Sequence, residues 1–125
     1  MKLLLDTHAF LWWTLGSASL KRAAATAIAN PGNAVFISVA SIWEIGLKKS
    51  LRLIQLPDDI EPELAKRGLT PLAVEIAHAE RALRLPDIHR DPFDRMLIAQ
   101  AQVEGLTLVT HDKLIFKYDV AVLKT

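Results

Sequence analysis

The sequence predicts an α/β fold, a three-layer α/β/α sandwich around a central parallel sheet of four or five strands. Apolar runs such as residues 3–5 and 34–37 show no polar alternation, which is typical of strands buried on both faces. Helix-like segments separate these runs along the chain, and this alternation favours parallel strands joined by covering helices. The chain has 125 residues without a linker or repeat, so we expect one domain over residues 1–125.

Breaker residues set the expected element boundaries. The Asn-Pro-Gly-Asn turn at residues 30–33, Pro86 and Gly105 each end a predicted helix, and Pro71 restricts the third strand to a sheet edge or a strand start. The predicted strands cover residues 3–5, 34–37, 72–74, 106–109 and 120–123. The predicted helices cover residues 9–15, 20–29, 38–49, 57–68, 75–85 and 92–104.

The composition excludes several classes of function. Lys and Arg number 15 against 14 Asp and Glu, so any binding of nucleic acid must come from a local basic patch. The chain has no cysteine, which excludes disulfides, thiolate metal sites and cysteine nucleophiles. No apolar run is long enough for a signal peptide or a membrane span, and we expect a cytoplasmic protein that does not bind membranes.

Four acidic residues fall where a parallel sheet would bring them together. Asp6 directly follows the first predicted strand, Glu44 lies in the helix after the second, and Asp112 comes shortly after the fourth. Asp94 lies in the first turn of the helix that leads into the fourth strand. Because functional crevices lie beyond the carboxyl ends of such strands, we expect these side chains to converge there.

Helix capping is the competing explanation for each acid taken singly. Asp6 and Asp112 are suited to N-cap positions, residues 41–44 (Ser-Ile-Trp-Glu) match a capping box, and residues 91–94 (Asp-Pro-Phe-Asp) resemble one. The helical spacing argues against capping for Asp94, because this residue shares a face with the apolar positions three, four and seven residues later. Glu44 lies within an apolar segment, where a solvated capping glutamate would be out of place.

Converging carboxylates need compensation by protons or cations. Two like charges about 4 Å apart repel by about 4 kcal/mol at an effective dielectric of 20. Arg95 is the nearest candidate partner of Asp94 in sequence, but adjacent helical residues point about 100° apart. An all-oxygen donor set without cysteine favours Mg²⁺ or Mn²⁺ over zinc.

Four sequence segments together resemble the PIN domain, and most closely the VapC-type toxins of prokaryotic toxin–antitoxin pairs. They are residues 3–8 (LLLDTH), 38–45 (SVASIWEI), 89–101 (HRDPFDRMLIAQA) and 108–112 (LVTHD). They occur in the family's order over nearly the whole chain. The resemblance implies a PIN-like fold and a metal-dependent endoribonuclease that acts as a toxin.

The resemblance assigns site roles residue by residue. The family's four acidic residues match Asp6, Glu44, Asp94 and Asp112, which are therefore the expected catalytic and metal-binding residues. Thr110 matches a hydroxyl residue that would support them. Asp91 competes with Asp94 for the third position, but the helix-face argument makes Asp94 the ligand and Asp91 the N-cap, with a supporting role.

The expected partners also follow from the resemblance. These are an RNA substrate, with tRNA among the candidates, a cognate antitoxin and a second copy of the chain. Four basic residues near the acids are candidates for RNA contact: Lys48, Lys49, Arg52 and Lys113. Two adjacent tryptophans cannot both face one core, so we expect Trp12 and Trp13 to be partly exposed at an interface.

Two alternatives to the nuclease differ in class. A phosphatase of the haloacid dehalogenase type would need a second Asp two residues after the first, where this chain has His8. A non-catalytic binding module could use the same acidic pocket to seat an arginine of a basic partner. Loss of metal binding on changing Asp6 and Asp94 would distinguish the enzyme from the module.

Overall fold

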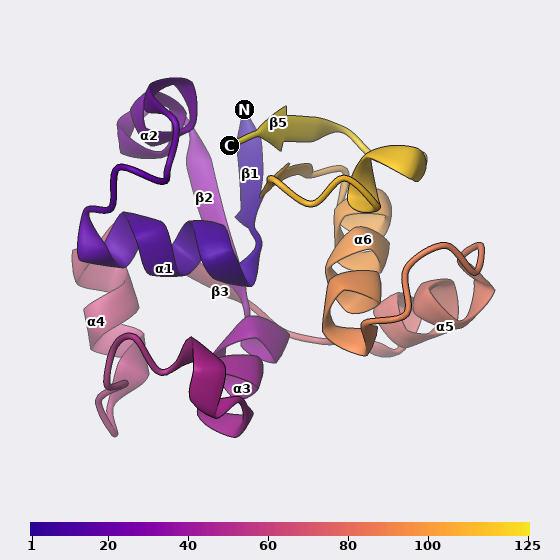
Figure 1. Cartoon of the computed structure of the whole chain (residues 1–125), viewed down its shortest axis with the longest axis horizontal. Coiled ribbons are helices and arrows are strands. Elements are labelled where there is room, and N and C mark those ends of the chain that lie inside the picture. Colours follow the sequence, from indigo (N-terminus) through magenta and orange to yellow (C-terminus); the bar gives the residue numbers. More distant parts are fainter.

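The computed structural model describes all residues, 1–125, and has a five-stranded sheet at its centre (Figure 1). The strands are β1 (Lys2–Leu5), β2 (Ala34–Ser38), β3 (Thr70–Leu72), β4 (Thr107–Thr110) and β5 (Val122–Lys124). Their order across the sheet is β3-β2-β1-β4-β5, and every pair of neighbours is parallel. This confirms the predicted parallel sheet.

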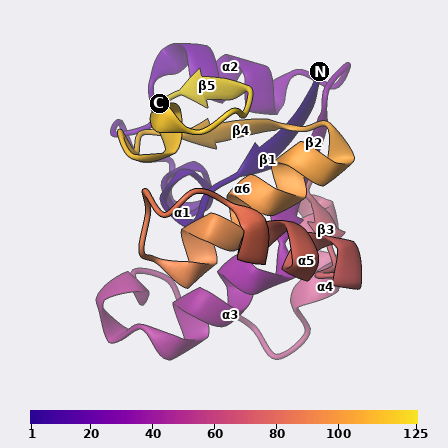
Figure 2. The same cartoon turned by 90° about the vertical axis from the view of Figure 1, so that its right-hand side faces the viewer.

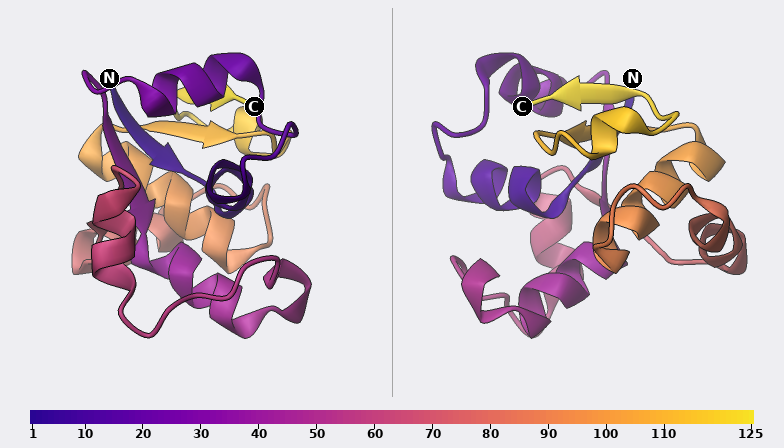
Figure 3. Two further views of the ribbon diagram at one scale, coloured as in Figure 1. Left: turned by 90° about the vertical axis from the view of Figure 1, so that its left-hand side faces the viewer. Right: turned by 45° about the vertical axis from the view of Figure 1, so that its right-hand side comes forward.

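Helices cover both faces of the sheet, which completes the predicted three layers (Figure 3). The helices are α1 (Thr7–Leu15), α2 (Arg22–Ala29), α3 (Val39–Leu47), α4 (Ile60–Lys66), α5 (Ile76–Arg84) and α6 (Pro92–Glu104). Residues of α1, α2 and α4 pack on one face and those of α6 on the other. Helix α5 lies along the outer side of α6 (Figure 2).

The central strand shows why the apolar runs do not alternate. Leu3 and Leu5 of β1 belong to the apolar cluster under α1 and α2, whereas Leu4 belongs to the cluster under α6. All three side chains are fully buried. A strand with helices on both faces needs apolar residues at every position.

Most differences from the sequence prediction lie at element ends. The third strand lies at residues 70–72 and not at 72–74, and it forms the sheet edge beside β2, where the missing N–H of Pro71 can be accommodated. The helix predicted from residue 57 begins only at Ile60. The helix predicted to run to residue 49 ends at Leu47, and a short 3₁₀ helix follows at Lys49–Leu51.

The structure excludes the competing explanation of residues 41–44 as a capping box, as the apolar surroundings of Glu44 indicated. Ser38 is the N-cap of α3, and its hydroxyl accepts a hydrogen bond from the N–H of Ala40 at 3.1 Å. Ser41 is therefore inside the helix, where its buried hydroxyl has no hydrogen-bond partner. Glu44 thus takes no part in capping α3, and its carboxylate can contact other residues.

Two further features bear on partners. Trp12 and Trp13 both pack against the core on one side and remain half-buried, so their predicted partial exposure is confirmed. None of the helices combines the length and the apolar character that a membrane span requires.

The loop before α6 is held by two side chains from outside it. The Tyr118 hydroxyl accepts the N–H of His89 at 2.7 Å and donates to the carbonyl of Pro86 at 2.8 Å. The Arg95 guanidinium donates to five acceptors, among them the carbonyls of Ala82 and Pro86, each at 2.9 Å. Both anchors fix the backbone at residue 89.

Candidate metal-dependent active site

The four predicted acids meet beyond the carboxyl ends of the strands, in two adjoining clefts. One cleft, of about 440 Å³, has no apolar residue in its lining, which comprises Asp6, His8, Asp94, His111, Asp112 and Lys113. The second, of about 310 Å³, shares His8 and Asp94 with the first and adds Glu44, Lys48 and Asp91 among its lining residues. Helix α3 contacts both α1 and α6, which brings Glu44 to the same end of the sheet (Figure 1).

Asp6 is both a helix cap and a cleft residue. Its backbone N–H donates to the carbonyl of Val109 in β4 at 3.0 Å, and its Oδ1 accepts from the N–H of Ala9 at 2.8 Å. The side chain is almost fully buried, and burial raises the pKa of Asp6, although hydrogen bonds from the Thr110 hydroxyl and from Ala9 oppose this rise. Asp6 therefore caps α1 and at the same time lines the cleft.

Asp94 does not cap its helix. Asp91 does so, because its Oδ1 accepts from the N–H of Phe93 at 2.8 Å, as the helix-face argument predicted. Burial and then the charge of Asp91 raise the pKa of Asp94 to about 7; Asp6 and Glu44 add to the rise, and His89 opposes it. Burial and repulsion from the neighbouring carboxylates thus both disfavour the charged form of Asp94.

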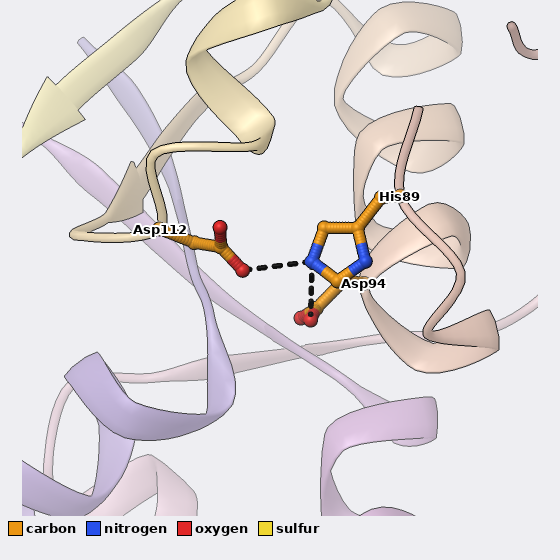
Figure 4. Close-up of side chains that lie close together, drawn as sticks. All are labelled: His89, Asp94 and Asp112. Carbon is orange, nitrogen blue, oxygen red and sulfur yellow. Dashed lines mark hydrogen bonds and ion pairs between the residues drawn. The ribbon is translucent and has the colours of Figure 1, made fainter. Parts of the chain in front are cut away.

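His89 joins two of the acids, a role that the sequence analysis did not find. Its Nε2 lies 2.7 Å from Asp112 Oδ2 and 3.1 Å from Asp94 Oδ2 (Figure 4). Its Nδ1 accepts the backbone N–H of Asp91 at 3.1 Å, so in the neutral ring the proton must be on Nε2. His89 is therefore a hydrogen-bond donor to the acids and not a metal ligand in this arrangement. Its proximity to Asp91 in sequence gave no indication of this contact.

Asp112 is fixed from two sides. Its Oδ1 accepts from the N–H of Leu114 at 2.8 Å, and its own N–H donates to the Thr110 hydroxyl at 3.1 Å. Burial alone would raise the pKa of Asp112, but the hydrogen bond from His89 and that from Leu114 outweigh it and hold this pKa below its usual range. Thr110, which also hydrogen-bonds Asp6, links the two acids that follow the neighbouring strands β1 and β4.

Lys48 lies among the acids and not on an outer rim. Its Nζ is 2.8 Å from Glu44 Oε2 and 3.1 Å from Asp91 Oδ2, and the other oxygen of Glu44 accepts the hydroxyl of Thr7. Burial alone would raise the pKa of Asp91, but Lys48 and the helical N–H of Phe93 together lower it. The hydrogen bond to Glu44 raises the pKa of Lys48.

The other basic residues are placed differently from one another. Lys113 lines the larger cleft, whereas Lys49 is exposed outside both clefts. Arg52 donates to the carbonyl of Gly46 at 2.7 Å and lines a separate hollow. Arg95 points toward backbone carbonyls and contacts no acid, as its helical position predicted.

The donor set fits a hard divalent cation. Three carboxylates, those of Asp6, Asp94 and Asp112, line the larger cleft beside His8, His111 and Lys113. Burial raises the pKa values of Asp6 and Asp94, so their charged forms are disfavoured in the metal-free protein. Carboxylate oxygens are the ligands that Mg²⁺ and Mn²⁺ prefer. Asp94 and Asp112, which would supply two of these ligands, lie close enough together for both to contact the Nε2 of His89.

The fold and this site define a protein class that sequence comparison identifies. The chain belongs to the PIN domain family, whose sequence model matches residues 3–121. This confirms the resemblance found in the sequence and the PIN-like fold. A search of curated proteins found no match.

Solved structures similar to this chain include a toxin–antitoxin complex and a complex with promoter DNA. VapBC2 from Rickettsia felis, bound to a DNA fragment from its promoter, has 14% identity and a TM-score of 0.69, with 100% of this chain and 99% of that chain covered. FitAcB from Neisseria gonorrhoeae has 22% identity and a TM-score of 0.67, with 97% and 96% covered. A toxin–antitoxin complex from Klebsiella pneumoniae has 23% identity and a TM-score of 0.66, with 97% and 95% covered. At these identities the likeness shows the fold.

The raised pKa of Asp94 predicts that the metal-free protein loses stability as the pH rises. The folded carboxyl, with a pKa of about 7, holds its proton over a range in which the unfolded carboxyl, at 3.8, has lost it. The contribution of Asp94 to the stability of the metal-free protein is therefore greatest below about pH 4 and falls up to about pH 7, by as much as about 4 kcal/mol. In chelator at pH 8, Asp94→Asn should melt at a higher temperature than the parent, and this difference should shrink toward pH 4.

Thermal melts across this pH range, with Asp87→Asn as the control, check the prediction. Asp87 is an exposed aspartate outside both clefts. A variant at position 94 that melts below the parent at pH 8 would show instead that Asp94 stabilises the fold.

The donor role of His89 predicts different effects for two substitutions. His89→Gln keeps an N–H donor in reach of Asp112, whereas His89→Ala removes it and should raise the pKa of Asp112, measured by carboxyl ¹³C NMR in chelator. Because a donor to a ligand also orients it, His89→Ala should weaken Mn²⁺ binding by about 10–100-fold and His89→Gln by less. Tighter Mn²⁺ binding by His89→Ala would show that the histidine competes with the ion.

Proposed function

We propose that this chain is a metal-dependent endoribonuclease that hydrolyses RNA phosphodiester bonds as the toxin of a toxin–antitoxin pair. The observation that carries the proposal is the meeting of Asp6, Glu44, Asp94 and Asp112, from four separate segments, at the carboxyl end of a PIN-type sheet. The carboxylate donors support Mg²⁺ or Mn²⁺ as the cofactor.

The residues of the chain would divide the work of this site. Asp6, Asp94 and Asp112 line the larger cleft and would hold the ion, with Glu44 beside them in the second cleft. A bound divalent ion supplies a Lewis acid for the phosphate and lowers the pKa of the attacking water. Thr110 orients Asp6, and His89 orients Asp112 and Asp94, so the acids are fixed before substrate arrives.

Basic residues at the clefts support the binding of an anionic substrate. Lys113 and His111 share the lining of the larger cleft with the acids and would meet a phosphate there. Lys49 and Arg52 lie farther out and would contact the RNA beyond the cleaved bond. The binding of RNA, including tRNA, by these residues is part of the proposal.

A cognate antitoxin as partner is supported by the similar toxin–antitoxin complex from Klebsiella pneumoniae, and a second copy of the chain by the family resemblance. A cognate antitoxin and a second copy of the chain are the expected protein partners, and the half-buried Trp12 and Trp13 offer apolar surface for one of them. Co-expression with the product of the adjacent gene should give a complex in which RNA cleavage is suppressed. Undiminished RNA cleavage in the presence of the adjacent gene's protein would contradict the assignment as a toxin.

The central experiment is cleavage of defined RNAs by the purified chain with Mg²⁺, Mn²⁺ or chelator. We expect cleavage with either ion and none in chelator. Asp6→Asn or Asp94→Asn should abolish cleavage, with a drop of at least about 100-fold, because each removes a ligand. The variant Asp119→Asn, altered at an exposed acid outside the clefts, should cleave like the parent.

The same variants separate the enzyme from a binding module. An enzyme loses Mn²⁺ affinity, measured by calorimetry, together with cleavage. A module that seats a basic partner would show no cleavage with either ion, and its metal affinity would not change in Asp6→Asn.

A further inference from the structure

Lys48 lies between two of the acids and lines the second cleft with them. It follows the last residue of α3, and its ammonium lies between Glu44 Oε2 and Asp91 Oδ2, at 2.8 and 3.1 Å. The same ammonium lies 5.2 Å from the centre of the Phe93 ring, so an aromatic side chain of α6 is its neighbour on that side. Adjacent Lys49 and nearby Arg52 contact no acid of the clefts.

The carboxylates next to Lys48 have both oxygens engaged. Glu44 accepts Thr7 on one oxygen and Lys48 on the other. Asp91 accepts the N–H of Phe93 on one oxygen and Lys48 on the other. These two acids are therefore compensated by groups of the chain itself.

The opposite side of the site has no such cation. No Lys or Arg side chain forms a salt bridge with Asp6, Asp94 or Asp112. His89 is the one basic side chain that contacts Asp94 and Asp112 there, whereas His8, His111 and Lys113 line the same cleft without an ion pair to its acids. The acids of this cleft therefore have no Lys or Arg partner, in contrast to Glu44 and Asp91, which share Lys48.

We propose that Lys48 is a resident cation that keeps Glu44 and Asp91 from binding a divalent ion, so that the chain binds one ion, on the side of Asp6 and Asp94, and not two. This inference rests on the proposed metal dependence and specifies it. An ammonium and a divalent ion repel each other at contact distance, so both cannot share the oxygens of Glu44 and Asp91. Lys48 is a positioning residue in this arrangement, since it acts through the two acids.

The test is the number of Mn²⁺ ions bound per chain, measured by calorimetry and by electron paramagnetic resonance. The parent should bind one ion and give the spectrum of an isolated Mn²⁺. Lys48→Met removes the charge and keeps the length of the side chain, and it should bind a second ion and give the spectrum of a spin-coupled pair. Lys49→Met, which makes the same charge change one residue later, should bind one ion.

Two further variants keep the test decisive. Lys48→Gln replaces Lys48→Met if circular dichroism shows that the latter is unfolded. Adding Glu44→Gln to the Lys48 variant should remove the second ion again, because the freed carboxylate is its ligand.

The possible failures are distinguishable. Two ions in the parent, or one ion in a folded Lys48 variant, would overturn the role of Lys48 while leaving a metal-dependent nuclease intact. A parent that binds no Mn²⁺ and cleaves no RNA with added ion would overturn the proposed function as well.

Discussion

Repulsion among five carboxylates at one end of the sheet is the constraint that organises this structure. Two of them, Glu44 and Asp91, are compensated by Lys48. Asp112 accepts a hydrogen bond from His89, whereas Asp6 and Asp94 have no Lys or Arg partner and their pKa values are raised, chiefly by burial. Buried acids are rare unless they are paired or bind metal, so the cluster is costly in a protein that has no use for it.

The sheet topology explains why the acids meet at this place. The chain runs outward from β1 to β2 and β3, and then returns to pair β4 with the other side of β1. The strand order thus reverses at β1, and a crevice opens at such a point beyond the carboxyl ends of the strands. Asp6 follows β1 and Asp112 follows β4, so the side chains of two distant segments flank the reversal.

The sequence predicts the parts of the site that depend on backbone direction and helical spacing. Asp6 and Asp94 were placed correctly because a strand end and a helix face determine where they point. His89 and Lys48 were not, because their positions depend on contacts across elements: the Tyr118 hydroxyl fixes the backbone of His89, and the end of α3 at Leu47 turns Lys48 toward Asp91. The spacing of residues along the sequence predicts neither the Tyr118–His89 contact nor the Lys48–Asp91 contact. The register of β3 and the start of α4 were missed for the same reason, since packing decides them.

The backbone contacts that support the site are independent of the charge of its acids. Arg95 and Tyr118 hold the loop before α6 through backbone carbonyls and N–H groups, none of which changes when a metal ion binds. The charge of the acids does change. Burial and the neighbouring carboxylates disfavour the charged form of Asp94, and a bound cation would stabilise that form. Metal binding would therefore stabilise the fold without rearranging it, since Thr110 and His89 already hold the positions of Asp6, Asp94 and Asp112. In a preorganised site of this kind, the carboxylates repel one another in the metal-free protein, and the bound ion removes this repulsion.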